Sequence, residues 1–574
     1  MNIFNTLKKY FFTIRCLRPV QIFNRILRRL PKIRPVIREV PVLNLVRGTW
    51  IAPVAGAPCL TGPNEFVFMG ERGSITEIGW NGPEREALWR YNLHYFDSLT
   101  ARGAQEQEDW HKNLIEDWVR QNPPCGGAGW EPYPLSRRIV NIIKWSLAGN
   151  ELTAVWKQSI FLQAAWLRRN IEWHLLANHL LANAKALIFA GLFFTGRKPR
   201  RWLSLGLAIL KSELDEQILA DGGHFERSPM YHAIVLEDIL DIINVLGAYY
   251  GADADVTAAA RAAIAMLGWA EVMTHPDTHI AFFNDSALGI APTLSQLSDY
   301  AERLHVASTA HPLAAPKDEP QRNVEPQCAR LPQSGYIKIA TGPATAILDV
   351  APIGPNYQPG HAHADTLSFE LSLWGMRVLV NGGTSCYGLS ARRLAERQTS
   401  AHNTVEINGE SSSEVWSGFR VGRRARPVGL RVLRNGKKLM VRCSHTGYRR
   451  IGGEHVRTWC MEPQSLTIED MVTGEHPAVA RFRFHPRCVV KTAGKNMLVV
   501  NVRGAARAAR LIIHRGSWRL ASGAYAPQFG AVLPAPVLEV SCAVREPALP
   551  GQQVLRESLV HIHWADEIPE EERR

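Results

Sequence analysis

Residues 360–371 have the sequence Gly-His-Ala-His-Ala-Asp-Thr-Leu-Ser-Phe-Glu-Leu, a polar cluster that continues into alternating apolar positions. Such alternation is typical of a β strand with one buried face. Residues two apart in a strand project from the same face, so the pattern places His361 and His363 together, where they suit a ligand or a metal ion. The stretch therefore predicts a sheet domain and part of a functional site.

The chain around this stretch divides into two halves of different character. Short β-branched runs with Gly and Asn turns predict an antiparallel β-sandwich over residues 333–574. Apolar residues at three- and four-residue spacing predict an array of α/α hairpins, a toroid or a solenoid, over residues 85–315. A Pro-rich passage at residues 311–332 marks the boundary between them. The expected helices are 87–99, 110–121, 135–147, 151–175, 180–194, 202–219, 231–249 and 256–273. The expected strands are 336–340, 346–350, 367–373, 377–380, 404–407, 438–442, 465–469, 497–502, 510–513 and 538–542.

Two shorter segments precede the helical array. Residues 46–84 are rich in Gly and Pro with short apolar runs, which predict a small β-rich appendage. Residues 1–45 form a basic amphipathic arm: residues 1–38 carry ten Lys or Arg and no acid, in a chain of 574 residues with a formal net charge of +13. Such an arm either contacts an anionic membrane surface peripherally or packs as a basic helix against its own protein, and the sequence leaves both open.

The sequence lacks the motifs that are typical of several classes of function. There is no P-loop, no Gly-x-Gly-x-x-Gly and no Cys-x-x-Cys, which argues against nucleotide, dinucleotide and thiolate-zinc sites. The basic excess lies in one terminal arm without a nucleic-acid motif, so no nucleic-acid partner is expected. No stretch reaches the roughly 18 uncharged apolar residues that a spanning helix needs, so no transmembrane helix is expected. No small-residue cleavage site follows the short apolar run near the start, so a cleavable signal peptide is not expected.

Two further clusters carry groups that suit acid–base chemistry. Asn178 and His179 interrupt an apolar helical run, although Asn178 is also a good helix N-cap, with His179 then an ordinary first-turn residue. Tyr231 and His232 open another apolar helix, so their polar ends are expected at its mouth. Downstream of residues 360–371 the chain adds a phenol and a further imidazole, at Tyr387 and His402.

In composition and in order, these segments resemble the heparinase II/III-like superfamily, which includes heparinases and oligoalginate lyases. The resemblance covers roughly residues 85–480 and rests on four motifs: Asn178-His179, Glu226-x-Ser228-x-x-Tyr231-His232, residues 360–369, and Ala-His-Asn-Thr-Val at residues 401–405. It implies an N-terminal (α/α) toroid followed by a C-terminal antiparallel β-sandwich, with the active site in the cleft between them. It also implies a location in the bacterial cell envelope or periplasm, although the missing export signal leaves the cytoplasm open.

The activity that the resemblance implies is that of a polysaccharide lyase, which cleaves a uronic-acid-containing acidic polysaccharide by β-elimination. Elimination removes the weakly acidic C5 proton, so the adjacent carboxylate must be neutralised; the motif positions for that task are Asn178 and His179, with His361 nearby. Tyr231 matches the general base and acid, a role that needs a lowered pKa and direct contact with the leaving oxygen. The residues expected to contact substrate are Tyr95, Arg137, Glu226, His232 and Tyr387.

Several members of the superfamily hold zinc at three positions that correspond here to His363, Asn381 and His402. Asn381 stands where relatives have an aspartate, and its amide brings no charge to offset the cation, so zinc binding is expected to be weak. The alternative is that Asn381 bridges the two histidines by hydrogen bonds and no metal binds. The lyase reaction itself requires no cofactor. Ala182 is a second departure, because relatives commonly carry a glutamate there.

Two other functions remain open. A non-lyase polysaccharide-modifying or binding protein of a capsule or O-antigen assembly pathway would keep the fold without the reaction. A glycoside hydrolase would need two carboxylates that face each other, for which Glu226 and Asp365 are the candidates. Unsaturated uronate ends, detected by ultraviolet absorbance, distinguish a lyase from a hydrolase.

Overall fold

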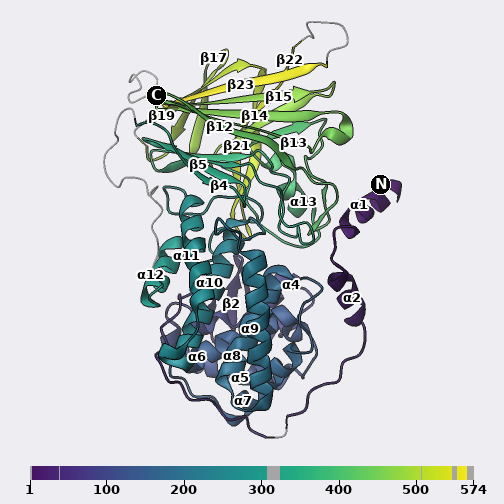
Figure 1. Ribbon diagram of the computed structural model, residues 1–574, viewed down its shortest axis with the longest axis vertical. Helices are drawn as coiled ribbons and strands as arrows, with labels where there is room; N and C mark the ends of the chain where they lie inside the picture. Colours follow the sequence, from purple (N-terminus) through teal and green to yellow (C-terminus); the bar gives the residue numbers. More distant parts are fainter. Residues whose placement is uncertain (1–2, 38, 307–323, 506, 546–552, 565–574) are drawn as a thin grey trace.

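The computed structural model describes residues 3–37, 39–306, 324–505, 507–545 and 553–564, and it divides into a helical half and a β-sheet half (Figure 1). The helical half is an (α/α) toroid and the sheet half is an antiparallel β-sandwich, which confirms the predicted fold class. A two-helix arm at the N-terminus runs along the side of the molecule, past the level where the halves meet (Figure 1). In the described ranges, no helix is long and apolar enough to cross a membrane.

The toroid follows a small three-stranded sheet within the predicted β-rich appendage. That sheet consists of β1 (Leu60–Gly62), β2 (Glu65–Phe68) and β3 (Glu71–Ser74). The helices are α3 (Ile75–Ile78), α4 (Ala87–Tyr95), α5 (Glu108–Gln121), α6 (Pro132–Leu147), α7 (Ala154–Leu167), α8 (Ala177–Phe193), α9 (Arg197–Gln217), α10 (Pro229–Tyr250), α11 (Thr257–Val272) and α12 (Leu294–Arg303). Helix α8 contacts α6, α7, α9 and α10, and every residue of α8 except His179 is buried. A helix that is apolar on all sides belongs in such a surrounded position, and His179 marks the place where the surrounding packing opens.

The predicted helices at residues 87–99 and 151–175 are both too long. The expected helix at residues 151–175 ends at Leu167, because Asn170 donates from Nδ2 to the carbonyl of Trp166 and closes the last turn. Residues 168–176 form a loop, and Leu176 and Ala177 have positive φ angles of 63° and 54° that turn the chain into α8. This loop brings Glu172 within hydrogen-bond distance of His179.

The sandwich has two layers that share one apolar core. One layer is a nine-stranded sheet with the main order β12-β13-β14-β15-β23-β19-β18-β17, and β22 pairs with β23. The other layer joins the five-stranded sheet β4-β5-β6-β7-β8 to the four-stranded sheet β20-β21-β16-β9 through a bridge between Leu379 and Phe484. The strands are β4 (Gln327–Leu331), β5 (Tyr336–Thr341), β6 (Ala344–Asp349), β7 (Phe369–Leu373), β8 (Met376–Leu379), β9 (Val405–Ile407), β10 (Val415–Trp416), β11 (Arg420–Val421), β12 (Pro427–Asn435), β13 (Lys438–His445), β14 (Glu454–Glu462), β15 (Ser465–Thr473), β16 (Ala478–Arg483), β17 (Cys488–Gly494), β18 (Met497–Val502), β19 (Ala508–Arg515), β20 (Ser517–Gln528), β21 (Ala531–Ser541), β22 (Ala543–Arg545) and β23 (Leu555–Trp564), and α13 (Ala391–Arg397) precedes β9.

Among the boundaries in the sheet half that differ from the expectation, two bear on the domain limit and on the site. Strand β4 begins at Gln327, ahead of residue 333, because the run between two prolines pairs with β5; residues 307–323 lie outside the described residues. The stretch 360–371 is a strand only from Phe369, where β7 begins. Leu367 has a φ of 64°, which a strand does not allow, so residues 360–368 form a loop. The prediction that His361 and His363 lie in a strand is therefore wrong.

The basic arm packs on the body of the protein through α1 (Ile3–Ile14) and α2 (Pro19–Leu27). On α1, the Tyr10 ring lies 4.8 Å from the Trp416 ring of the sandwich. On α2, Gln21 is fully buried and donates to the carbonyl of Tyr357 at 3.2 Å. One face of the arm thus fits the interpretation of a basic helix packed against its own protein.

Candidate active site

Asn178 lies at the start of α8 and is held by a buried carboxylate. Its Nδ2 donates to Oε1 of Glu226 at 2.8 Å, and its backbone N–H donates to the same oxygen at 3.2 Å. Leu176 occupies the N-cap position without a side-chain cap, so the interpretation of Asn178 as an N-cap is wrong. An amide nitrogen carries two hydrogens, and the second one of Asn178 meets no acceptor among the described residues. That hydrogen is available to a ligand.

His179 is partly exposed and is held by the buried carboxylate of Glu172. Its Nδ1 lies 3.2 Å from Oε2 of Glu172, and Asn183 donates to the same oxygen at 3.1 Å. Burial lowers the pKa of His179, but the Glu172 carboxylate outweighs burial and holds the pKa above its ordinary value. The side chain is 30% exposed, so the imidazole is a ready donor to an anionic ligand.

Tyr231 enters the site from the first turn of α10. Ser228 caps this helix by accepting the backbone N–H of Tyr231 at 3.1 Å. The Tyr231 hydroxyl lies 3.0 Å from the hydroxyl of Tyr387, and its ring stacks on His361 with centroids 3.7 Å apart. The structure thus brings together two tyrosines and a histidine that are far apart in the sequence.

The protonation of Tyr231 differs from the expectation. Burial first, and then the Tyr387 phenol, hold the pKa of Tyr231 well above its ordinary value. A general base needs the opposite shift, so the expectation of a lowered pKa is wrong. A phenol that keeps its proton at neutral pH suits a proton donor.

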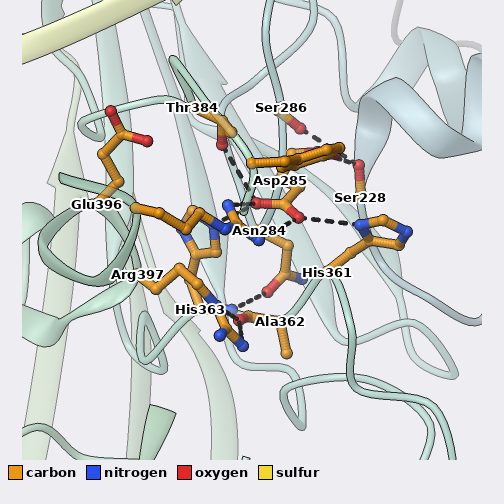
Figure 2. A network of polar contacts seen from close by, with 12 residues as sticks. Ser228, Asn284, Asp285, Ser286, His361, Ala362, His363, Thr384, Glu396 and Arg397 are labelled. Carbon is orange, nitrogen blue, oxygen red and sulfur yellow. Dashed lines mark hydrogen bonds and ion pairs between the residues drawn. The ribbon is translucent and has the colours of Figure 1, made fainter. Parts of the chain in front are cut away.

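Asp285 is the hub of the polar network at the junction of the two halves (Figure 2). Its carboxylate accepts from Nδ1 of His361 at 2.9 Å and from Nε2 of His363 at 2.8 Å. Arg393 from α13 donates to both carboxylate oxygens, one of them at 2.7 Å. Burial alone raises the pKa of Asp285, but the Arg393 guanidinium and the hydrogen bonds from His361 and His363 hold it well below its usual range. A shared carboxylate, and not strand geometry, is what brings the two histidines together.

The contact with Asp285 also determines which ring nitrogen of a neutral His361 carries the hydrogen. An ionised carboxylate only accepts, so Nδ1 of His361 carries the hydrogen and Nε2 presents a lone pair when the ring is neutral. Nε2 lies 3.5 Å from Oε2 of Glu226, on the side of Asn178. His361 is therefore held between Asp285 and Glu226, beside the groups suited to bind a carboxylate.

His232 and Asp365, two other candidates, are not placed to meet a ligand. His232 is buried, its Nδ1 accepts from the backbone N–H of His224, its Nε2 bonds the carbonyl of Met266, and its ring stacks on Trp269. The expectation that His232 contacts substrate is wrong, because both ring nitrogens are used in the core. Asp365 is buried and accepts the backbone N–H of Asn284, so it does not face Glu226 as the second carboxylate of a hydrolase.

Tyr95 and Arg137 adjoin the site through an aromatic neighbour. Tyr133 lies 4.7 Å from the His179 ring and 5.9 Å from the Tyr95 ring. Arg137 pairs with Asp97 at 2.9 Å and keeps a quarter of its side chain exposed, at 25%. These residues form one edge of the site next to His179.

The three candidate zinc ligands meet only in part. The rings of His363 and His402 lie 5.2 Å apart, and Nδ1 of His363 and both ring nitrogens of His402 are buried without a hydrogen-bond partner among the described residues. Asn381 instead donates to the carbonyl of Phe282 at 2.9 Å and accepts the backbone N–H of Asn403 at 3.2 Å. The proposed Asn381 bridge between the histidines is therefore wrong. The unpartnered imidazole nitrogens are of a ligand type that zinc takes, while the third candidate, Asn381, is uncharged and already bonded.

We expect Asn381→Asp to bind zinc more tightly than the natural chain, because it restores a negative charge beside two imidazoles. Zinc should then raise the Tm of this variant but not that of the natural protein. Elemental analysis of both proteins, purified without chelator, checks this expectation. Adding His402→Ala to the variant should remove the zinc-dependent shift. Near-stoichiometric, tightly held zinc in the natural sequence would contradict the charge argument.

Sequence reasoning missed Asp285, Arg393, Glu172 and Tyr133 as members of the site. Asp285 sits in a polar triplet, Asn-Asp-Ser at residues 284–286, directly after an apolar run, and that interruption was the available signal. The other three are common residue types whose position depends on tertiary contacts.

Comparison with known proteins agrees with the fold. Residues 66–306 match the family described as Heparinase II/III N-terminus, and residues 323–555 match Heparinase II/III-like, C-terminal. FtsZ-localized protein C from Caulobacter vibrioides is 25% identical over 446 residues, or 71% of this chain and 72% of that protein. A heparin-sulfate lyase from Pedobacter heparinus is 23% identical over 371 residues, or 58% of this chain and 53% of that protein. The crystal structure of heparinase III has a TM-score of 0.66 at 17% identity, over 86% of this chain and 81% of that one.

The toroid followed by the sandwich defines the toroid–sandwich class of folds, which this chain shares with heparinase III. Both family matches together span most of the chain, in the order toroid then sandwich. The chain belongs to the heparinase II/III-like family. This relation supports a polysaccharide lyase.

Proposed function

We propose that this protein is a polysaccharide lyase that cleaves a uronic-acid-containing polysaccharide by β-elimination. The observation that carries the proposal is the convergence of Asn178, His179, Tyr231 and His361 from three separate segments on one site. These groups supply the three things that elimination needs: neutralisation of a carboxylate, a base and a proton donor.

Asn178 and His179 bind the uronate carboxylate. The free N–H of Asn178 and the ring of His179 both donate hydrogen bonds, and the Glu172 carboxylate, which raises the pKa of His179, favours the protonated ring. Charge on this carboxylate grows as the C5 proton leaves and an enolate-like intermediate forms, so these donors stabilise the transition state more than the bound substrate.

His361 and Tyr231 divide the proton transfers. Nε2 of His361 takes the C5 proton, and the electron pair of that bond moves into the carboxylate to give the intermediate. The pair then returns to form the C4–C5 double bond, the C4–O bond breaks, and Tyr231 gives its phenolic proton to the leaving oxygen. Solvent afterwards takes the proton from His361 and returns one to Tyr231. The raised pKa of Tyr231 supports the donor half of this scheme, and the bond from His361 to Asp285 supports the base half.

Replacing Asn178 or His179 by alanine should lower kcat by about 100-fold while changing KM less, because the charge that they meet grows in the transition state. Steady-state kinetics on the cleaved polymer measure both constants. Asn150→Ala, which removes an amide bonded to the carbonyl of Trp145 at the end of α6, is the matched control and should change neither. A raised KM with an unchanged kcat would make both residues binding residues only.

A second candidate function, a non-lyase polysaccharide-binding or polysaccharide-modifying protein, keeps the same fold. It is favoured by one observation: FtsZ-localized protein C, a relative, is named for its location and not for a reaction. Incubating the purified chain with uronate polymers, including heparan sulfate, alginate and acidic glycans of the bacterial cell envelope, separates the two. A lyase generates ultraviolet-absorbing double bonds from at least one of them, whereas binding without new double bonds on any polymer supports the second candidate.

A further inference from the structure

The inner face of the N-terminal arm is anchored to both halves of the protein. Arg18 forms an ion pair with Glu216 of the toroid and lies over the Tyr357 ring of the sandwich, 3.9 Å from its centroid. On α1, Oγ1 of Thr13 accepts a hydrogen bond from Nε1 of Trp416 at 3.2 Å. These contacts fix the arm in one position on the folded protein.

The outer face of the arm exposes large apolar side chains to water. They recur at helical spacing on each helix and are between 51% and 62% exposed. The set is Leu7, Phe11 and Ile14 from α1, Phe23 and Ile26 from α2, and Leu30 just beyond α2. Exposed apolar side chains gathered in this way mark a surface that binds another apolar phase.

Uncompensated positive charge surrounds these side chains. Within the described part of the chain, Arg18 is the arm cation that pairs with a carboxylate. The exposed cations of the two helices and their ends include Lys8, Arg15, Arg25, Arg28 and Arg29. The sandwich adds positive charge beside the arm through Arg420. Burial first, and then the nearby Arg420 cation, lower the pKa of Arg25. A surface of this kind attracts an anionic partner.

We propose that the arm is a preformed docking surface for an anionic lipid bilayer. Its outer apolar side chains enter the interfacial region, and the surrounding cations pair with anionic lipid headgroups. A bilayer is favoured over a soluble polyanion because a polysaccharide offers no apolar phase to cover Phe11, Phe23 and Ile26.

The docking surface is connected to the candidate active site. Helix α1 packs on the β10–β11 hairpin, and Phe419 at the turn of that hairpin lies 6.4 Å from the His361 ring. The inner face of the arm contacts both the toroid and the sandwich. The outer face can therefore bind a bilayer while these inner contacts stay in place.

Cosedimentation of the full chain with lipid vesicles tests the proposal. Vesicles of phosphatidylglycerol and phosphatidylcholine should pellet the protein, vesicles of phosphatidylcholine alone should not, and added salt should weaken the binding. Phe11→Ser/Phe23→Ser should lower the apparent affinity for anionic vesicles by at least about tenfold. The matched control is Val155→Ser/Val544→Ser, which removes apolar side chains that are 52% and 55% exposed on α7 and β22, and it should bind like the natural protein.

A second variant, Lys8→Glu/Arg29→Glu, leaves the inner-face contacts of Arg18 and Thr13 in place and should lose anionic-vesicle binding to a similar extent. Circular dichroism and thermal unfolding establish that each variant is folded. Equal binding to neutral and anionic vesicles, or unchanged binding of both variants, contradicts the proposal. The proposal is also contradicted if the protein binds a soluble polyuronate through these residues but does not bind vesicles. Conversion of a dimer to a monomer by the serine variant, seen by sedimentation velocity, would instead assign the surface to a second copy of the chain.

Discussion

Tyr231→Phe should lower kcat on the cleaved polysaccharide by at least about 100-fold, the size of a lost proton-transfer group. The variant removes one hydroxyl, which lies 3.0 Å from Tyr387, and keeps the ring that stacks on His361. The fold should be intact, because the backbone of Tyr231 is held by the Ser228 cap and not by the hydroxyl. The expected loss therefore reports chemistry and not folding.

The matched control for Tyr231→Phe is Tyr448→Phe, which removes a hydroxyl that donates to the carbonyl of Val405 inside the sandwich. That control should cost stability but leave kcat unchanged. If Tyr231→Phe keeps its turnover within about threefold, which is under roughly 0.7 kcal/mol of barrier, Tyr231 does not transfer the proton.

Asp285→Asn should have the largest combined effect on stability and activity. It leaves the buried Arg393 guanidinium without its countercharge, which costs about 3–5 kcal/mol when one partner of a buried pair is removed. It also leaves one acceptor oxygen where Asp285 had two, so His361 and His363 cannot both keep their bonds to this side chain, and kcat should fall by about 100-fold in whatever protein remains folded. Denaturant unfolding and kinetics at low temperature measure the two losses separately.

The acid dependence of stability gives an independent readout of Asp285. Its pKa lies well below the usual range in the folded protein. Asp285 therefore contributes stability above its unfolded-state pKa of about 3.9, and this contribution is lost as the pH falls through the folded-state pKa. Asp285→Asn should flatten the loss of stability below about pH 4.

Asp277→Asn is the matched control for the hub variant, because Asp277 also pairs with an arginine, Arg377, at 2.8 Å but is 26% exposed. It should cost less stability and leave kcat unchanged. If the two variants lower kcat equally, Asp285 does not act by positioning His361.

The sequence was most informative where local pattern determines structure. The helical spacing of residues 180–194 and 231–249 predicted α8 and α10, because both helices are buried on nearly all sides and carry long apolar runs. The alternation at residues 336–340 likewise predicted β5, which pairs along its length with β4 and β6. In these elements local propensity and tertiary burial agree.

The polar site was less predictable, because its contacts join segments that are far apart in the chain. Asp285 bonds His361, 76 residues away, and Arg393, 108 residues away, and no local pattern encodes either distance. The spacing of His361 and His363 indicated a strand, but the positive φ of Leu367 breaks the strand before it reaches them. His232 was misassigned for a related reason: its sequence neighbour Tyr231 faces the site, while the helix turns His232 by about 100° into the core.

The most direct test of the proposed elimination is to count two product features for each cleavage of the polymer that the purified chain attacks. New double bonds are measured by ultraviolet absorbance, and new reducing ends by a colorimetric assay in the same samples. Elimination with His361 as base and Tyr231 as proton donor predicts one double bond for every new reducing end, with both signals falling together in Tyr231→Phe. New reducing ends without double bonds would mean hydrolysis and would contradict the lyase assignment.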